Sequence, residues 1–298
     1  MPDVAQRPFL FQDDPEDEVD EADLGLVYDL GTLHRRQVIK ALGFGAFSAS
    51  LFTIVGCGPA GASGSTGASA AASASSAAAT ADARSAASCA VIPEETAGPF
   101  PADGSNGPDV LNQSGVVRSD ITKSFGSSSG TAAGVPLTIK LAIQDSGTEC
   151  APIAGAAVYL WHCDQDGNYS LYSQAAANEN YLRGVQEAGD DGVVTFQSIF
   201  PACYSGRWPH VHFEVYPSLA LATDENNKVA TSQIALPKDI CDQVYATDGY
   251  GSSVQTLSQV SLQSDMVFGD DGGARQLGTI SGSVADGLTV ELAVPVGA

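Results

Sequence analysis

The chain has 298 residues, of which 44% are hydrophobic and 16% charged, so it can bury a sizeable core. Its formal net charge is −22, with only 13 Lys and Arg side chains. Because binding to phosphate backbones requires basic patches, this composition argues against a nucleic-acid-binding function. The acidity itself identifies no partner, and part of it is local, since residues 13–23 read DDPEDEVDEAD.

Residues 33–57 have the features of an export signal. Arg35 and Arg36 precede an apolar run, 41–55, that is shorter than the roughly 20 residues of a membrane span. A basic stretch followed by a short apolar one is typical of a signal peptide, and the paired arginines resemble a twin-arginine signal. The run ends in IVGC, which resembles a lipidation site at Cys57; the alternatives are a plain signal peptide cut nearby and an uncleaved anchor. We therefore predict an exported protein, periplasmic or at the cell surface.

A low-complexity segment follows, and it predicts the domain boundaries. Residues 58–88 are rich in Ala, Ser and Gly without a periodic apolar face, which is typical of a flexible linker. The sequence thus predicts an acidic N-terminal segment with signal and lipobox over 1–57, a linker over 58–88, and a folded domain over 89–298. Some 210 residues suit a single domain.

Five cysteines lie beyond Cys57, and disulfides are expected outside the cytoplasm. An odd number leaves at least one cysteine free or paired between chains. No CxxC pair is present, which argues against a zinc–thiolate site. The sequence does not determine the pairing among Cys89, Cys150, Cys163, Cys203 and Cys241.

Short strands separated by turn residues dominate residues 89–298. The segment 136–145, PLTIKLAIQD, alternates apolar and polar residues, as a half-buried strand does. Long amphipathic helical repeats are absent from the sequence, and only 237–246, PKDICDQVYA, predicts a helix. We predict an all-β fold, a β-sandwich of mostly antiparallel strands with long loops and little helix. The other predicted strands cover 156–164, 192–199, 210–217, 232–237 and 288–294.

Two of the four histidines of the chain occur in one short stretch, 201–215, PACYSGRWPHVHFEV. Because strand side chains alternate between faces, His210 and His212 point the same way and could bind one metal ion. Tyr204 and Arg207 lie in the preceding loop, within reach of the same place, and Tyr169 lies in a turn after another strand. The simpler interpretation is a half-buried strand with ordinary turn aromatics and a surface arginine. His162, beside a tryptophan on a predicted strand, is interpreted as a packed core residue.

Together these residues resemble the intradiol ring-cleavage dioxygenases, the family of protocatechuate 3,4-dioxygenase and catechol 1,2-dioxygenase, and within it the exported branch. The order and spacing of several segments carry the resemblance, which covers most of residues 89–298. The segments are PEETAGPF (93–100), VRSDI (117–121), CAPIAGAAVYLWHCDQDGNYSLY (150–172), YLRGVQEAGDDGVVTFQSIFPACYSGRWPHVHFEV (181–215), TSQIAL (231–236) and SDMVF (264–268).

The resemblance implies a non-haem Fe(III) held by Tyr169, Tyr204, His210 and His212. It also implies catalytic roles for three residues. Tyr204 would leave the metal when the substrate binds, Arg207 would stabilise the charge that develops on the ring, and Gln233 would support that charge by hydrogen bonding. The short YSGRWPH loop departs from the family pattern beside the substrate pocket, so the identity of the substrate stays open.

The function that follows is oxidative cleavage of a catechol-type ring between its two hydroxyl-bearing carbons by O2, giving a cis,cis-muconate-type product. The partners would be the catechol and O2, with no nucleic acid, and with a membrane only through Cys57; a homo-oligomer is compatible with the sequence. Two alternatives remain, a non-catalytic β-sandwich lipoprotein that binds a ligand, and a copper or zinc site with other chemistry.

Overall fold

The computed structural model describes residues 89–297. The predicted signal, the candidate lipid anchor at Cys57 and the predicted linker lie outside the described residues. Within residues 89–297, no helix is long and apolar enough to cross a membrane.

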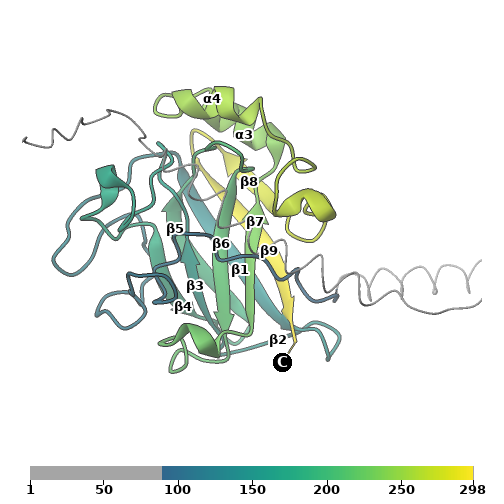
Figure 1. The fold of residues 1–298 in the computed structure, drawn as a ribbon. Helices are drawn as coiled ribbons and strands as arrows, with labels where there is room; N and C mark the ends of the chain where they lie inside the picture. The colour runs from purple at the N-terminus through teal and green to yellow at the C-terminus, as the bar shows by residue number, and fades with distance from the viewer. Residues whose placement is uncertain (1–88, 298) are drawn as a thin grey trace, which may run out of the picture.

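Two sheets pack face to face in a β-sandwich (Figure 1). In the first sheet, β1 pairs antiparallel with β5 on one side and parallel with β9 on the other, and β8 follows β9. The second sheet has the strand order β4-β3-β6-β7 and is antiparallel throughout. The strands are β1 (Pro136–Asp145), β2 (Ala151–Pro152), β3 (Ala157–Trp161), β4 (Arg183–Glu187), β5 (Val193–Ile199), β6 (His210–Tyr216), β7 (Ala230–Ala235), β8 (Thr279–Ser283) and β9 (Gly287–Val296).

Helices are few among the described residues, and the two α-helices lie side by side at one end of the sandwich (Figure 1). The helical elements are η1 (Gln174–Ala176), η2 (Glu225–Asn227), α3 (Lys238–Tyr245), α4 (Gly251–Leu257) and η3 (Phe268–Asp270).

The β-sandwich prediction is confirmed, and each predicted strand has a counterpart in the structure. The strand predicted over 136–145 coincides with β1, and the predicted helix is α3. The sequence analysis did not anticipate β4, β8 and α4. β4 reads RGVQE, in which a buried arginine and a glycine hide the alternation that marks a strand.

A core of aliphatic and aromatic side chains fills the space between the sheets. Ile139 and Leu141 of β1 meet Val211 and Phe213 of β6 in one buried cluster. On β6 the alternate residues His210, His212 and Glu214 therefore point to the outer face of the second sheet. They are buried as well, because loops and a second cluster that includes Tyr159 and Trp161 cover that face. The second sheet is thus covered on both faces.

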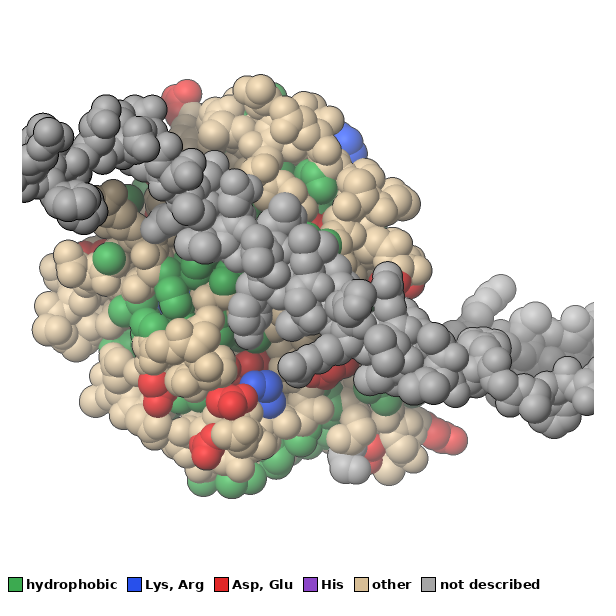
Figure 2. Space-filling view, viewed as in Figure 1, with side chains coloured by type: hydrophobic (Ala, Val, Ile, Leu, Met, Phe, Trp, Pro, Cys, Tyr) green, Lys and Arg blue, Asp and Glu red, His purple; other side chains and the backbone are tan. Residues whose placement is uncertain are grey.

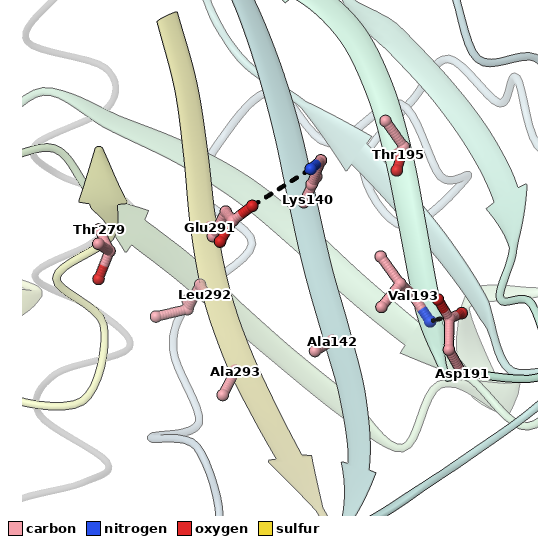
Figure 3. A pocket seen from close by; sticks show the side chains of 9 residues that line it. All are labelled: Lys140, Ala142, Asp191, Val193, Thr195, Thr279, Glu291, Leu292 and Ala293. Carbon is pink, nitrogen blue, oxygen red and sulfur yellow. Dashed lines mark hydrogen bonds and ion pairs between the residues drawn. The ribbon is translucent and has the colours of Figure 1, made fainter. Parts of the chain in front are cut away.

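The outer face of the first sheet differs, because it is polar. A groove of ≈ 580 Å³ runs there between β1, β5 and β9, lined by small and polar side chains, and the Lys140–Glu291 ion pair spans it at 3.2 Å (Figure 3). On the face of the molecule shown in Figure 2, acidic side chains outnumber basic ones, as expected from the net charge. The groove holds neither histidine nor tyrosine and lies on the far side of the sandwich from the predicted site residues.

One disulfide, Cys89–Cys150, ties the beginning of the described chain to the turn after β1. The segment that follows Cys89 runs beside other strands, since Ile92 donates its N–H to Pro295 O, and Glu95 donates its N–H to Thr231 O. The disulfide therefore anchors a segment that has few backbone contacts of its own. The three other cysteines within residues 89–297, Cys163, Cys203 and Cys241, are free and buried.

Replacing both Cys89 and Cys150 by Ser should lower the free energy of unfolding by about 2–4 kcal/mol, because the bond closes a loop of 61 residues in the unfolded chain. Guanidinium denaturation of the variant and of the oxidised wild type measures this. Reduced wild type should match the variant, and an unchanged midpoint would show that the segment is held without the disulfide.

A group of carboxylates lies buried beside Lys228 on the outer face of the second sheet. Lys228 Nζ lies 3.4 Å from Glu214 Oε1, 3.8 Å from Asp103 Oδ2 and 2.5 Å from Glu225 Oε2. Burial, and then the charge of Asp103, raises the pKa of Glu214 to about 8. The folded protein therefore holds a proton on this carboxyl at pH values at which the unfolded chain has released it.

This proton links stability to pH. Between the ordinary glutamate pKa and about 8, the folded state binds one more proton than the unfolded state, so the free energy of unfolding falls as pH rises through that window. Glu214→Gln should remove this part of the pH dependence and be about 1–3 kcal/mol more stable relative to wild type at pH 9 than at pH 5. Urea denaturation from pH 5 to 9 tests this, with exposed Glu291→Gln as the matched control. Parallel curves for wild type and Glu214→Gln would contradict it.

Candidate functional site

Four of the predicted site residues meet at one point on the outer face of the second sheet. His210 Nε2 lies 3.0 Å from His212 Nε2, 3.1 Å from Tyr204 Oη and 3.4 Å from Tyr169 Oη. The two phenol oxygens are 3.2 Å apart. The structure therefore brings together the two tyrosines and two histidines that the sequence analysis singled out.

Different elements deliver these side chains. The two histidines stand on one face of β6, as the His-x-His spacing predicts. Tyr169 follows a turn in which the Asp164 carboxylate accepts the N–H groups of Asp166 and Asn168. Tyr204 lies in the loop between β5 and β6. Gly167 of the turn lies against Tyr204, since a side chain there would meet Tyr204 Cβ at 3.6 Å.

Hydrogen bonding fixes the protonation of His210. Its Nδ1 lies 2.5 Å from Trp208 O, and a carbonyl oxygen can only accept, so Nδ1 carries the proton. Nε2 of the neutral ring then presents a single lone pair, yet four groups lie within 3.5 Å of it: the two phenols, His212 Nε2 and Arg207 Nη1. One lone pair cannot serve four neighbours as a hydrogen-bond acceptor.

A metal ion bound between these atoms would account for this crowding. Nitrogen and oxygen ligands about 2.1 Å from a shared metal, at angles between 90° and 110°, would lie about 3.0–3.4 Å from one another. The three separations from His210 Nε2 and the separation of the two phenol oxygens fall in that range. Within the described chain there is no cluster of three or more His, Cys, Asp or Glu that could hold a metal, so tyrosines must contribute to any site here.

Burial governs the electrostatics of the cluster. Tyr169, His210 and His212 are almost inaccessible to solvent, whereas Tyr204 is half-buried. Burial, followed by the proximity of Tyr204, raises the pKa of Tyr169 well above its ordinary value. Burial also lowers the pKa of both histidines, and the charge of Arg207 lowers them further. Without a cation the imidazoles are neutral, with lone pairs available as ligands, and the Tyr169 phenol is protonated.

Arg207 and Gln233, the other two predicted site residues, lie beside the cluster. Arg207 Nη2 donates to Gln233 Oε1 at 2.6 Å, and Arg207 Nη1 lies 3.5 Å from His210 Nε2. Gln233 stands on β7 directly opposite His212 and donates its own N–H to Thr96 O at 2.9 Å. The amide therefore orients the guanidinium from a rigid strand.

Sequence reasoning missed two residues that support the site. Asp265 forms a buried ion pair with Arg207, with Nε and Oδ2 3.0 Å apart. Arg183 is fully buried and donates to Ser170 Oγ and Ser170 O, each at 2.9 Å, which fixes the turn that carries Tyr169. Asp265 lies in the segment SDMVF, which is one of the segments that carry the family resemblance, so the sequence did offer a reason to consider it. Arg183 had no signal, because nothing in the sequence shows that it is buried.

Close packing fixes the rings of the cluster. The Trp161 indole stacks on the His212 imidazole, with centroids 4.9 Å apart and planes 6° apart. The Phe100 ring lies 4.9 Å from the Tyr169 ring. Gly98, which has a φ of +72°, lies so near that a Cβ there would come within 3.3 Å of His212 Cε1. The imidazole therefore has little freedom to turn.

His162 does not belong to the cluster, in agreement with its interpretation as a core residue. Its ring nitrogens lie 2.7 Å from Cys163 O and 2.7 Å from Ser198 Oγ. Burial lowers the pKa of His162 to about 4, so the ring is neutral. Burial likewise raises the pKa of the free Cys203 thiol to about 12, which leaves this cysteine protonated and unreactive.

Comparison with known proteins relates part of the chain to a family. A family model described as "Dioxygenase" matches residues 106–225, a range that contains both tyrosines, both histidines and Arg207. The chain is 42% identical over 57 residues to chlorocatechol 1,2-dioxygenase of Rhodococcus opacus, which is 19% of this chain and 22% of the relative. It is 35% identical over 60 residues to catechol 1,2-dioxygenase 1 of Acinetobacter lwoffii, which is 20% of this chain and 19% of the relative. The matches thus span about a fifth of the length of these relatives.

The fold has a solved counterpart. An intradiol ring-cleavage dioxygenase from Tetranychus urticae superposes with a TM-score of 0.54 at 24% identity, covering 70% of this chain and 95% of the other. Fold and site define a β-sandwich protein with a buried tyrosine–histidine centre. The chain is similar to the dioxygenase family over residues 106–225 and shares the fold of one of its solved members.

Gly98 offers a test of the packing around His212. Gly98→Ala should lower the free energy of unfolding by about 1–2 kcal/mol through left-handed strain, and by more through the contact with His212. Gly126→Ala is the matched control, because Gly126 has a φ of +68° and no atom lies within 4 Å of the place that an added methyl group would take. Chemical denaturation of both variants, together with metal-binding titrations, measures the difference. Equal losses of stability and unchanged metal affinity would contradict a tightly packed His212.

Proposed function

We propose that this protein is a non-haem Fe(III) dioxygenase that cleaves a catechol-type ring between its two hydroxyl-bearing carbons. In the balanced reaction one catechol and one O2 give one cis,cis-muconate-type dicarboxylic acid, with both oxygen atoms retained in the product. The observation that carries the proposal is the convergence of two phenol oxygens and the His212 Nε2 nitrogen on His210 Nε2, each 3.0–3.4 Å from it. Similarity to the dioxygenase family model and to chlorocatechol 1,2-dioxygenase supports the choice of substrate and reaction.

The donor set fits a ferric ion. Phenolate oxygen is a hard, anionic ligand that suits Fe(III), and imidazole binds iron readily. Tyr169, Tyr204, His210 and His212 would hold the ion, and burial of the site would exclude competing water. A ferric ion bound here would supply the Lewis acidity and redox activity that allow a catecholate to react with O2.

The side chains of this chain then have separate tasks. Tyr204 is more exposed than Tyr169, so its Oη is the atom that can take up a proton from a substrate hydroxyl as the substrate enters. Tyr169 and the two histidines stay in place, because Phe100, Trp161 and the Trp208 carbonyl hold their rings. The Arg207 guanidinium, beside His210, stabilises the negative charge on the ring that reacts.

We also propose an exported enzyme, carried by a twin-arginine route and tethered through a lipid at Cys57 and the linker 58–88, with the folded domain beginning near Cys89. The support comes from the sequence of residues 33–88 alone. Location outside the cytoplasm would bring the domain into contact with small phenols in the surroundings of the cell.

Anaerobic visible spectroscopy of the full-length protein, loaded with Fe(III), is the first experiment. We expect a tyrosinate-to-iron charge-transfer band that moves to longer wavelength when catechol is added, followed by O2 uptake and a muconate-type product when air is admitted. A protein that stays colourless after loading and consumes no O2 with any catechol would refute the proposal. A colourless protein isolated with zinc would favour other metal chemistry.

Substitution of the tyrosines separates their tasks. Tyr169→Phe should lose iron and colour, whereas Tyr204→Phe should keep iron, change the band and lower kcat by about 100-fold, since it lacks the proton acceptor. Tyr172→Phe is the matched control, because this neighbouring phenol bonds to the Ala102 N–H and to Asn106 rather than to the cluster. Steady-state O2 uptake and iron analysis provide the readouts. Equal behaviour of Tyr204→Phe and Tyr172→Phe would contradict the assignment.

A further inference from the structure

We propose that Asp265 is a positioning residue that fixes both the Arg207 guanidinium and the ring of His210. The inference rests on the proposed function and adds a residue to it. Asp265 lies in the loop between α4 and η3, 58 residues beyond Arg207, and no part of the sequence analysis gave it a role.

The Asp265 carboxylate is buried and fully occupied. The residue is 2% exposed, and Oδ2 accepts Arg207 Nε at 3.0 Å and Trp208 N at 2.6 Å. Oδ1 accepts the N–H groups of Val267 and Phe268, at 2.8 and 3.0 Å. Four N–H donors hold two oxygens, so the carboxylate has one orientation and cannot rotate without leaving donors unpaired.

The ion pair determines which edge of Arg207 faces the cluster. With Nε on Asp265 and Nη2 on Gln233 Oε1, the planar guanidinium is gripped at two of its three nitrogens. The third, Nη1, is then directed towards His210 Nε2. A neutral acceptor in place of the carboxylate would leave the group less firmly held, because the buried ion pair between Arg207 and Asp265 would be lost.

The same carboxylate acts on His210 through the backbone. Asp265 Oδ2 accepts the N–H of Trp208, and the carbonyl of Trp208 accepts the Nδ1 proton of His210. Trp208 is held at its other end too, because its indole N–H donates to Leu236 O at 2.9 Å. Asp265 therefore supports the tautomer in which His210 Nε2 keeps its lone pair for the cluster.

Asp265→Asn is the variant that tests this. An amide can offer its oxygen to only one of the two pairs of N–H donors, and its NH2 group must face the other pair. We expect kcat to fall at least 10-fold while KM changes less than about threefold, with iron content unchanged. Asp242→Asn is the matched control, because Asp242 forms an exposed ion pair with Lys238 at 2.7 Å and lies outside the site.

Two further measurements distinguish positioning from a general loss of structure. If Asp265 acts on turnover through Arg207, the double variant Arg207→Ala/Asp265→Asn should have the kcat of Arg207→Ala within about twofold. Asp265→Glu, which keeps the carboxylate, should recover part of the activity that Asp265→Asn loses. Multiplicative losses in the double variant would overturn the action of Asp265 through Arg207, and no recovery with Glu would overturn the need for a carboxylate at this position.

Nuclear magnetic resonance of the full-length protein without metal gives a readout that does not depend on activity. The Arg207 Nε proton and the His210 Nδ1 proton should be protected from exchange in wild type and in Asp242→Asn, and exchange faster in Asp265→Asn. Unchanged protection in Asp265→Asn would overturn the proposal, even if the wild type cleaves catechols. If the wild type cleaves no catechol but the protons respond as expected, the proposed function fails while the positioning role of Asp265 stands.

If Asp265→Asn fails to fold, Arg207→Lys provides a second test, because lysine has no Nε to donate to Asp265. In this variant the His210 Nδ1 proton should exchange no faster than in wild type, and kcat should fall at least 10-fold. A wild-type kcat in Arg207→Lys would overturn the proposal.

Discussion

The burial of β6 on both faces is the constraint on which the rest of the structure depends. One face of the strand carries apolar residues into the core between the sheets, and the other carries His210, His212 and Glu214 into a second buried layer. Buried polar side chains must find partners, because a lone one costs about 1–3 kcal/mol. The long loops of this fold supply those partners. Contacts with the polar face of β6 in turn hold the loops in place.

The groups that surround these three side chains come from several segments of the chain. Backbone oxygen of Trp208 receives the His210 proton, the Trp161 ring covers His212, and Lys228 faces Glu214. Supporting residues need support in turn, and buried arginines provide it in two places. Arg183 joins the Tyr169 turn to the Phe100–Pro101 segment, and Arg207 joins β7 to the loop of Asp265. A centre built from so many segments is held by the folded domain as a whole, so its geometry does not depend on any single loop.

The sequence could predict the features of the fold and site that depend on residues close together in the chain, and not those that depend on contacts between distant segments. Alternation along 136–145 and 210–217 predicted two strands, and the His-x-His spacing alone placed both imidazoles on one face. The resemblance to a known family, and not side-chain periodicity, assigned the other four site residues. The structure brings all four close to the histidines: Tyr169, Tyr204, Arg207 and Gln233. The Cys89–Cys150 pairing, Arg183 and Asp265 depend on contacts between segments 13 to 83 residues apart, for which a single sequence carries no periodic signal.

Charge balance explains why the two tyrosines of the proposed centre differ in exposure. A buried site tolerates little net charge, and the Arg207–Asp265 pair is already neutral. Two phenolates would leave one positive charge of a ferric ion uncompensated, which favours entry of an anion. A catechol that gives up both protons brings two negative charges, so one phenolate must be neutralised if the site is to stay balanced. Tyr204, half-buried where Tyr169 is enclosed, is the phenol with room to accept that proton and swing aside. Under the proposed function, the unequal burial of these two chemically identical side chains would thus leave Tyr169 to hold the metal and Tyr204 to exchange with the substrate.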